Sequence, residues 1–358
     1  MNQKFLLTLT VVSLSFTAFL GGYLISQKDF HRNSDSVSTG TILDKFSDDN
    51  HNTSPQTGES IGNLRLLSPR NVISPTLSKE KDSIVYYEKN TGKVFEITLK
   101  DLRERSVSDV PLVDLIKTIW SPSRKEVVSF FYYPSGGHYK YFNYKNRASV
   151  DLGADIKSLS FSPDGNQIAY FGTENSSRGI FISQPDGSSS KKILPSRLEN
   201  AEVYWPSNEF LSFKTYTENG SELYSLSKNG EVKKILETGD NFEVKWSKDG
   251  SMVLFSKKTD SGVGLFYKNI LSGPETPLNV STRASKCDWS IDGETIVCGI
   301  PRLSASGDDI YEISLDGTQK LLSSPTTRIN TAELFISGLD DYVVILNSLD
   351  DKLYVLKK

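Results

Sequence analysis

The chain repeats itself with a period of a little over forty residues. At seven places an aromatic residue or a leucine closes a short strand-like segment and precedes a polar turn. The spacings between successive markers are 43, 41, 44, 41, 43 and 46 residues. A regular period of this length is typical of supersecondary units that stack and bury their faces against one another. The seven markers are Leu77, Trp120, Phe161, Trp205, Trp246, Trp289 and Phe335.

Each repeat carries the signals of four strands. After the marker at 161 the chain reads Ser162-Pro-Asp-Gly165, and Asp-Gly turns also follow the markers at 246 and 289. Asp-Gly supplies the positive φ that tight hairpin turns require. An apolar strand, a third strand, a second turn and a short fourth strand come next. Seven repeats of four antiparallel strands predict an all-β fold, a seven-bladed β-propeller spanning residues 62–358. A two-sheet sandwich is the main competitor, but it gives no reason for the regular period.

The two ends of this region complement each other. The seventh repeat stops at Lys358 after its third strand, so its outermost strand is missing. Residues 63–69 (NLRLLSP) resemble residues 319–325 (QKLLSSP), the fourth strand of the sixth repeat. We therefore predict that residues 62–68 supply the missing strand and close the ring, which removes an open sheet edge.

The turns carry a family resemblance. Ser162-Pro-Asp-Gly165, followed by an apolar strand, resembles the WD-like repeats of TolB-type propellers, and WSKDG at 246–250 and WSIDG at 289–293 resemble them more loosely. The resemblance covers residues 62–358 and implies the propeller fold, but it does not imply a function, because propellers host unrelated activities. TolB proteins carry an α/β domain ahead of the propeller, and we expect a tether in that position here.

The N-terminal segment predicts a membrane anchor. Residues 5–25 carry no charge and follow Lys4, and a run of this length can cross a bilayer core of about 30 Å as a helix. We assign residues 1–27 as an uncleaved signal anchor; a cleaved signal peptide and a buried helix stay open as alternatives. Residues 28–61 are rich in Ser, Thr, Asp and Asn and predict a disordered linker. The expected location is the cytoplasmic membrane, with a single span and the propeller outside the cytoplasm, periplasmic or extracellular.

The charge balance points away from nucleic acid. The chain has 41 Lys plus Arg against 44 Asp plus Glu, a formal net charge of -3. A nucleic-acid-binding protein would normally present a basic stripe or face. The expected partner is therefore a protein or an envelope polymer.

Motifs for catalysis are missing from the sequence. It contains 3 histidines and no HExxH, Gly-rich phosphate loop or GxSxG motif. We predict no catalytic residue, metal site or cofactor. The two cysteines, Cys287 and Cys298, flank the Trp289 turn on adjacent strands, and pairing Trp289 with Ile296 places them opposite each other. A cross-strand disulfide and two buried free thiols are both compatible with this spacing.

Binding is predicted on one rim of the propeller. Turns after the first and third strands of a blade share one rim and look short, whereas the other connections look longer. Binding residues tend to lie on longer, variable loops held by a rigid scaffold. Tyr with scattered Arg is typical of protein-recognition surfaces. The predicted binding residues are Tyr132, Tyr133, His138, Tyr139, Arg197, Asp240, Arg283, Arg302 and Arg328.

Three functional hypotheses follow from these observations. The first is a membrane-tethered, extracytoplasmic, non-enzymatic propeller that binds a protein partner or envelope component through the longer-loop rim. The second is a propeller hydrolase or lyase that uses carboxylates near the central channel. The third is a purely structural assembly part.

Overall fold

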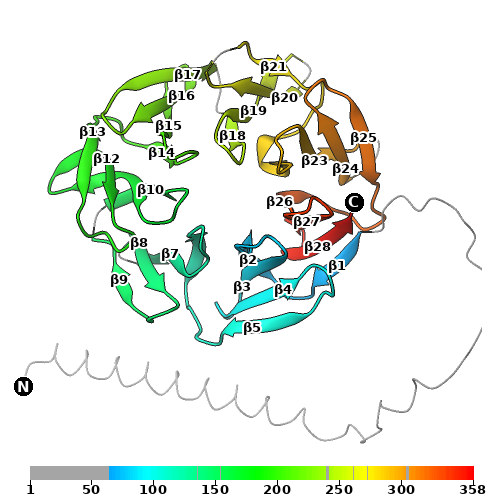
Figure 1. The fold of residues 1–358 in the computed structure, drawn as a ribbon, viewed down its shortest axis with the longest axis horizontal. Helices are drawn as coiled ribbons and strands as arrows, with labels where there is room; N and C mark the ends of the chain where they lie inside the picture. Colours follow the sequence, from blue (N-terminus) through cyan, green and yellow to red (C-terminus); the bar gives the residue numbers. More distant parts are fainter. Residues whose placement is uncertain are drawn as a thin grey trace, which may run out of the picture. The chain divides into compact units, whose positions relative to one another are not determined.

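A ring of seven sheets forms the folded part of the chain in the computed structural model (Figure 1). The structure describes residues 64–358, except 135, 154, 239–241, 261, 272, 304 and 305. Every sheet has four antiparallel strands. The predicted all-β, seven-bladed propeller is therefore confirmed. Within the described residues no helix is long and apolar enough to cross a membrane. The predicted anchor (1–27) and linker (28–61) lie outside the described residues.

The blades follow the sequence order, each from its innermost to its outermost strand. Blade 1 contains β2 (Val72–Leu77), β3 (Ser83–Glu88), β4 (Val94–Thr98) and β5 (Glu104–Ser108). Blade 2 contains β6 (Leu115–Trp120), β7 (Glu126–Tyr133), β8 (Gly136–Asn143) and β9 (Ser149–Asp151). Blade 3 contains β10 (Asp155–Phe161), β11 (Ile168–Glu174), β12 (Ser177–Ser183) and β13 (Lys191–Pro195). Blade 4 contains β14 (Ala201–Tyr204), β15 (Phe210–Thr217), β16 (Gly220–Ser227) and β17 (Val232–Thr238).

The remaining blades are built in the same way. Blade 5 contains β18 (Glu243–Trp246), β19 (Met252–Thr259), β20 (Gly262–Asn269) and β21 (Thr276–Pro277). The 3-10 helix η1 (Ala284–Lys286) leads into blade 6, which contains β22 (Cys287–Trp289), β23 (Thr295–Pro301), β24 (Asp308–Ser314) and β25 (Gln319–Ser323). Blade 7 contains β26 (Thr331–Ile336), β27 (Tyr342–Asn347) and β28 (Lys352–Lys357), and its outermost strand is β1 (Arg65–Ser68).

Strand β1 comes from the start of the described chain and completes the sheet at its end. It runs antiparallel to β28, with Arg65 opposite Val355 and Ser68 opposite Leu353. Leu67 is buried among residues of blades 1 and 7, and the Ser68 Oγ lies 3.0 Å from the Tyr86 Oη of blade 1. Blade 7 is thus assembled from two segments that are distant in the sequence.

The ring has two sides that differ in the loops they carry. Each innermost strand starts at a connection from the preceding blade and ends at a turn into its second strand. We call the rim with the blade-to-blade connections the connection side, and the opposite rim the turn side. Because strands alternate in direction, the connections between second and third strands lie on the connection side. Strand β1 runs from the turn side to the connection side, where it leads into β2.

A serine and an aspartate shape the turns after the innermost strands. The Ser162 Oγ donates to the Asp164 Oδ1 at 2.6 Å, and the Ser162 backbone carbonyl accepts the Gly165 N–H at 2.9 Å. Gly165 has a φ of 77°, in the left-handed region that glycine adopts without strain. The turns at 247–250 and 290–293 repeat these contacts. The positive φ predicted for the Asp-Gly turns is therefore confirmed.

The core consists of the contacts between neighbouring blades. Trp289 is completely buried and packs in a cluster that contains Leu254 of blade 5 and Ile313 of blade 6. Trp205 packs in the same way against Phe171 of blade 3. The large marker residues therefore fill the space between sheets, as packing of one sheet on another requires.

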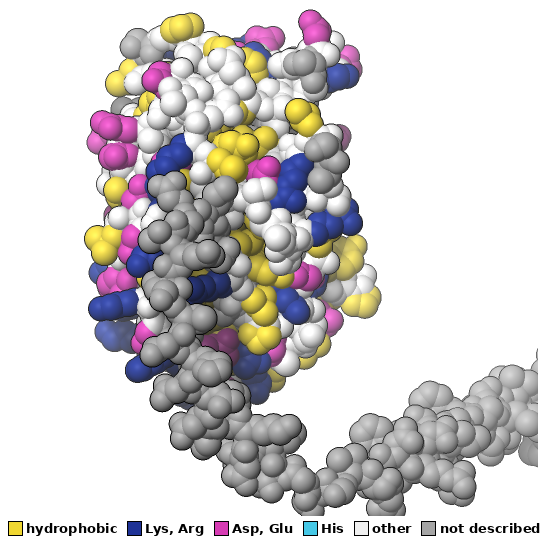
Figure 2. Space-filling view, turned by 90° about the vertical axis from the view of Figure 1, so that its right-hand side faces the viewer, with side chains coloured by type: hydrophobic (Ala, Val, Ile, Leu, Met, Phe, Trp, Pro, Cys, Tyr) yellow, Lys and Arg dark blue, Asp and Glu magenta, His cyan; other side chains and the backbone are white. Residues whose placement is uncertain are grey.

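The outer surface mixes charges of both signs. In Figure 2, Lys and Arg side chains alternate with Asp and Glu over the face in view, and hydrophobic side chains lie between them. This pattern agrees with the near balance of charges in the sequence.

Candidate functional site

The predicted binding residues come from the connection side, but its loops are not uniformly the longer ones. Only residues 175–176 join β11 to β12, and only 218–219 join β15 to β16, whereas the turn from β10 to β11 takes residues 162–167. The predicted loop asymmetry is therefore wrong as a general rule. The second and third strands of these blades are longer on the connection side than the sequence suggests. They stay paired as far as two-residue hairpin turns. The long connections are local, at 278–286 and 324–330.

The four predicted residues of blade 2 have different environments. Tyr132 and His138 are exposed, and the Tyr132 side chain is 64 % exposed. Tyr133 is half-buried, and its ring lies 5.6 Å from the His138 ring. Tyr139 is buried against the Phe130 ring, with 4.8 Å between the centroids. Three of the four therefore reach the surface, and Tyr139 belongs to the core.

An apolar pocket lies between blades 1 and 2, next to Tyr132 and Tyr133. Its volume is 360 Å³. The connection 109–114 forms one wall and carries two exposed valines, Val110 and Val113, the latter 74 % exposed. We call this site the blade 1–2 pocket. Aromatic and aliphatic side chains make up most of its lining: Tyr87, Val94, Val110, Pro111, Leu112, Val113, Phe131, Tyr133, Phe142 and Tyr144.

Two tyrosine hydroxyls lie among the polar groups of the blade 1–2 pocket, which also include Ser108, Asp114, Ser129, Lys140 and Ser149. The Tyr87 and Tyr144 Oη atoms lie 2.5 Å apart. Burial raises the pKa of the Tyr144 phenol to about 12, and burial together with the neighbouring Tyr144 raises the pKa of Tyr87. Both phenols are therefore neutral at physiological pH. The pocket is therefore mainly apolar, with uncharged phenols and only Asp114 and Lys140 as charged lining residues, which suits an apolar or aromatic side chain.

The predicted arginines divide into paired and exposed residues. Arg283 donates to Glu243 at 2.9 Å, and Arg302 donates to Asp309 at 2.6 Å. Arg302 also lines a 650 Å³ cavity between blades 5 and 6. Arg197 and Arg328 are exposed. The structure does not gather these residues into one site, and Asp240 lies outside the described residues.

A second cavity, polar in character, opens at the inner ends of blades 2, 3 and 4. Its volume is 650 Å³, and its lining includes Lys117, Lys157, Glu199, Glu202 and Tyr216. Glu202 is its best-connected group, because it accepts hydrogen bonds from two tyrosines and lies 3.0 Å from the Lys214 Nζ. Burial opposes ionisation of Glu202, but these partners outweigh it and lower its pKa. Glu202 is an anchored, ionised carboxylate.

The pKa of Glu333, on β26, is shifted in the opposite direction. Its side chain is accessible to solvent, yet the surrounding blades desolvate it and raise its pKa, and the charge of Lys245 only partly opposes this. Glu333 lies on the innermost strand of blade 7 and Glu202 on that of blade 4. The inner part of the ring thus contains two carboxyls whose environments shift their pKa values in opposite directions.

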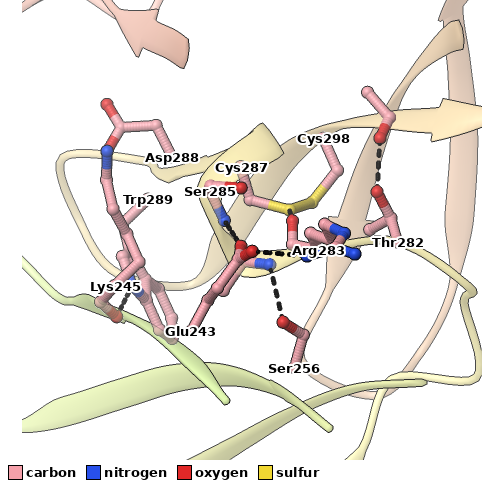
Figure 3. Close-up of a disulfide and its surroundings, with 12 residues drawn as sticks. Glu243, Lys245, Ser256, Thr282, Arg283, Ser285, Cys287, Asp288, Trp289 and Cys298 are labelled. Carbon is pink, nitrogen blue, oxygen red and sulfur yellow. Dashed lines mark hydrogen bonds and ion pairs between the residues drawn. A yellow bond between two sulfur atoms is a disulfide. The ribbon is translucent and has the colours of Figure 1, made fainter. Parts of the chain in front are cut away.

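The two cysteines form a disulfide in the structure, beside η1 (Figure 3). The predicted register is confirmed: Cys287 pairs with Cys298, and Trp289 pairs with Ile296. Both cysteines are fully buried. Next to the bond, Glu243 accepts from the Arg283 guanidinium and from the Ser285 backbone N–H at 3.1 Å. The disulfide therefore braces the point where η1 enters blade 6.

Comparisons with known proteins place the chain among β-propellers. No protein-family model and no curated protein sequence matches it. An oligogalacturonate lyase in complex with manganese aligns with a TM-score of 0.61 and 10 % identity, over 82 % of this chain and 92 % of that one. The β-propeller domain of the Trilobed protease from Pyrococcus furiosus aligns with a TM-score of 0.53 and 14 % identity, over 80 % of this chain and 92 % of that one.

TolB from Acinetobacter baumannii is also among the similar structures. It aligns with a TM-score of 0.47 and 14 % identity, over 83 % of this chain and 64 % of that one. At such identities the likeness shows the fold alone. The resemblance to TolB-type repeats in particular stays a prediction.

Among the described residues, no group of three or more His, Cys, Asp or Glu side chains is arranged to hold a metal ion. The sequence-based prediction does not include the blade 1–2 pocket, although residues 109–114 read DVPLVD, an apolar run in a blade-to-blade connection. It had also missed the pairing of Arg283 and Arg302, because their acidic partners lie on other strands.

Proposed function

We propose that this protein is a non-enzymatic binding propeller, held on a membrane anchor outside the cytoplasm, that captures a protein partner through the blade 1–2 pocket. The observation that carries the proposal is this mainly apolar pocket, whose wall carries the exposed side chains of Val110 and Val113. Protein interfaces concentrate their binding energy in such desolvated pockets, which take an apolar or aromatic anchor from the partner.

The placement of the first strand supports this arrangement. Strand β1 begins on the turn side, so a chain that precedes it reaches the propeller there. Val110 and Val113 lie on the opposite, connection side. The start of β1 and the wall of the pocket are therefore on opposite sides of the propeller. The buried disulfide supports an oxidising compartment, because such bonds persist outside the cytoplasm.

Site-specific photo-crosslinking in cells tests the proposal. A photoreactive amino acid at position 113 should give a discrete crosslinked species with one envelope protein. The same amino acid at position 339 is the control, because Leu339 is 86 % exposed on the turn side. The Val113→Asp substitution should abolish capture by a probe at position 110, on the same wall of the pocket, since it places a charge at the mouth of a mainly apolar pocket. Equal crosslinking from 113 and 339 would refute the pocket as the recognition site.

Location is tested separately from binding. In spheroplasts with an intact inner membrane, added protease should degrade the propeller domain, and alkaline extraction should leave the full chain in the membrane fraction. Protection from the protease would contradict a propeller outside the cytoplasm, and release by alkali would contradict an uncleaved anchor.

A lyase or hydrolase is the second candidate function. The observation that favours it is that Glu202 and Glu333, on the innermost strands of blades 4 and 7, have pKa values shifted in opposite directions, as the acid and the base of such a reaction require. The fold shared with an oligogalacturonate lyase is compatible with it. Turnover of oligogalacturonate or another glycan that is lost in both Glu202→Gln and Glu333→Gln would establish this function. Equal activity in the wild type and in both variants would remove it.

A further inference from the structure

A group of cations meets on the turn side, on the opposite side of the ring from the connection that carries Val110 and Val113. Lys248 lies in the turn of blade 5, Lys81 in that of blade 1, and Arg124 in that of blade 2. Lys245 belongs to β18, and Asp288 to β22. We call these five residues the turn-side cluster.

Contacts between neighbouring blades hold the turn-side cluster together. The Lys248 Nζ lies 2.9 Å from both carboxylate oxygens of Asp288, which also accepts the Ile336 backbone N–H of blade 7 at 3.2 Å. The Gly338 N–H of blade 7 donates to the Lys81 carbonyl at 2.9 Å. The Arg124 Nε donates to the Leu77 carbonyl of blade 1 at 2.6 Å. The cluster is thus built by five blades, 5, 6, 7, 1 and 2.

Positive charge exceeds negative charge within the cluster. Asp288 is buried, already accepts Lys248 on both oxygens, and has Lys245 at 3.7 Å. Glu333, the other carboxyl that acts on Lys245, has a raised pKa. No carboxylate among the described residues forms an ion pair with Lys81 or Arg124. The cluster therefore contains four cationic side chains and one carboxylate, Asp288, which is already paired with Lys248 and Lys245.

Arg124 is unusual because its guanidinium is enclosed without an acidic partner. Its Nε and Nη1 donate to the backbone carbonyls of Leu77 and Ser121, and its Nη2 has no acceptor among the described residues. Burial lowers the pKa of Arg124 to about 10. Burial lowers the pKa of Lys81 too, and the charge of Lys248 lowers it further; Asp288 partly opposes this, and Arg124 adds to it. Cations that destabilise one another in this way are stabilised when an anion binds between them.

We propose that the turn-side cluster is an anion-binding site for a phosphate group. Cations converge on it from separate blades, and a tetrahedral, doubly charged anion presents oxygens in several directions at once. A single carboxylate presents two oxygens in one plane and one charge. The guanidinium of Arg124 and the ammonium groups of Lys81 and Lys248 are the donors that phosphate oxygens prefer in proteins.

Calorimetric titration of the wild-type protein with inorganic phosphate and with glycerol 3-phosphate, at constant ionic strength set with chloride, tests the site. Saturable binding of phosphate supports it and indicates a free anion as ligand. Binding of glycerol 3-phosphate alone supports it and indicates a phosphate carried on a larger molecule. Binding of neither compound overturns the proposal.

A matched pair of variants locates the site. Lys81→Gln should weaken phosphate binding at least about tenfold, because it removes a charge with no carboxylate of its own. Lys79→Gln is the control, because Lys79 is an exposed lysine in the same turn with the same charge change. Its affinity should stay within about twofold of wild type. Equal losses in both variants would mean diffuse attraction and would overturn the assignment. Crosslinking from position 113 is unaffected by either variant, so this test is independent of the proposed partner site.

Discussion

The contribution of β1 to the ring is the sharpest stability prediction. In this strand Leu66 is 48 % exposed, whereas Leu67 is 8 % exposed and packs against Val344 and Leu353 of blade 7 and Leu77 of blade 1. The Leu67→Ala substitution removes buried methyl groups and leaves a cavity, which costs about 2 to 5 kcal/mol in protein cores. An outermost strand can relax inward, so we expect the lower half of this range, about 2.5 kcal/mol.

This loss translates into a measurable change in Tm. A domain of roughly 300 residues unfolds with an entropy of about 0.6 kcal/mol/K, so the Tm should fall by about 4 °C. Leu66→Ala, one residue away in the same strand, should change the free energy of unfolding by less than about 0.5 kcal/mol. Differential scanning calorimetry of both variants provides the comparison. Equal Tm values for the two variants would refute the idea that β1 closes blade 7 in solution.

Three further predictions concern the blade 5–6 region. Asp288→Asn should cost about 3 kcal/mol in urea unfolding at pH 7, because it leaves the ammonium group of Lys248 without its counter-charge. Lys245 and Lys248 outweigh burial and lower the folded-state pKa of Asp288, so this contribution exists above its unfolded pKa and is lost as pH falls through the lower folded value. A wild-type-to-variant difference that stays constant from pH 7 to pH 3 would contradict it. Replacing both Cys287 and Cys298 by Ala should lower the free energy of unfolding by about 3 kcal/mol, because the bond closes a loop with a separation of 11 residues. Alkylation of two thiols in the unreduced wild-type protein would disprove the bond. Trp289→Ala should lower the free energy of unfolding by about 3 to 5 kcal/mol, whereas the exposed control Ile291→Ala should lower it by less than about 0.5 kcal/mol. Comparable denaturation midpoints for the two variants would show that Trp289 does not pack between blades.

Local signals in the sequence were sufficient to predict the fold. The marker residues Trp120 and Trp246 end innermost strands as expected, because an aromatic residue at that position packs against the neighbouring sheet and the polar turn must follow it. The pairing of Cys287 with Cys298 followed from the turn between them, since register in a hairpin is set by its turn. Both inferences use residues that are close in the sequence.

Loop lengths and loop exposure were less predictable. Tyr139 reads as a loop residue in a Tyr-rich and Gly-rich segment, but β7 and β8 continue pairing as far as Tyr133 and Gly136, which turns Tyr139 inward. Arg302 reads as a free rim cation, but Asp309 stands on the paired strand beside it. Strand extension and cross-strand partners depend on tertiary pairing, which local composition does not encode.

The candidate sites depend on the ring in a way that explains why a single repeat could not reveal them. In β18 the period of two residues sends Val244 and Trp246 into the cluster shared with blade 4, and it sends Glu243 and Lys245 toward Arg283 and Asp288 of the blade 5–6 side. Within one repeat the charged set is indistinguishable from an ordinary solvated strand face. Only when neighbouring blades meet do these charges acquire partners, and only when blades 7 and 1 meet does Lys81 come within range of Lys248. The same contact between blades 7 and 1 buries Leu67, so loosening β1 and losing the phosphate site are linked consequences of one interface.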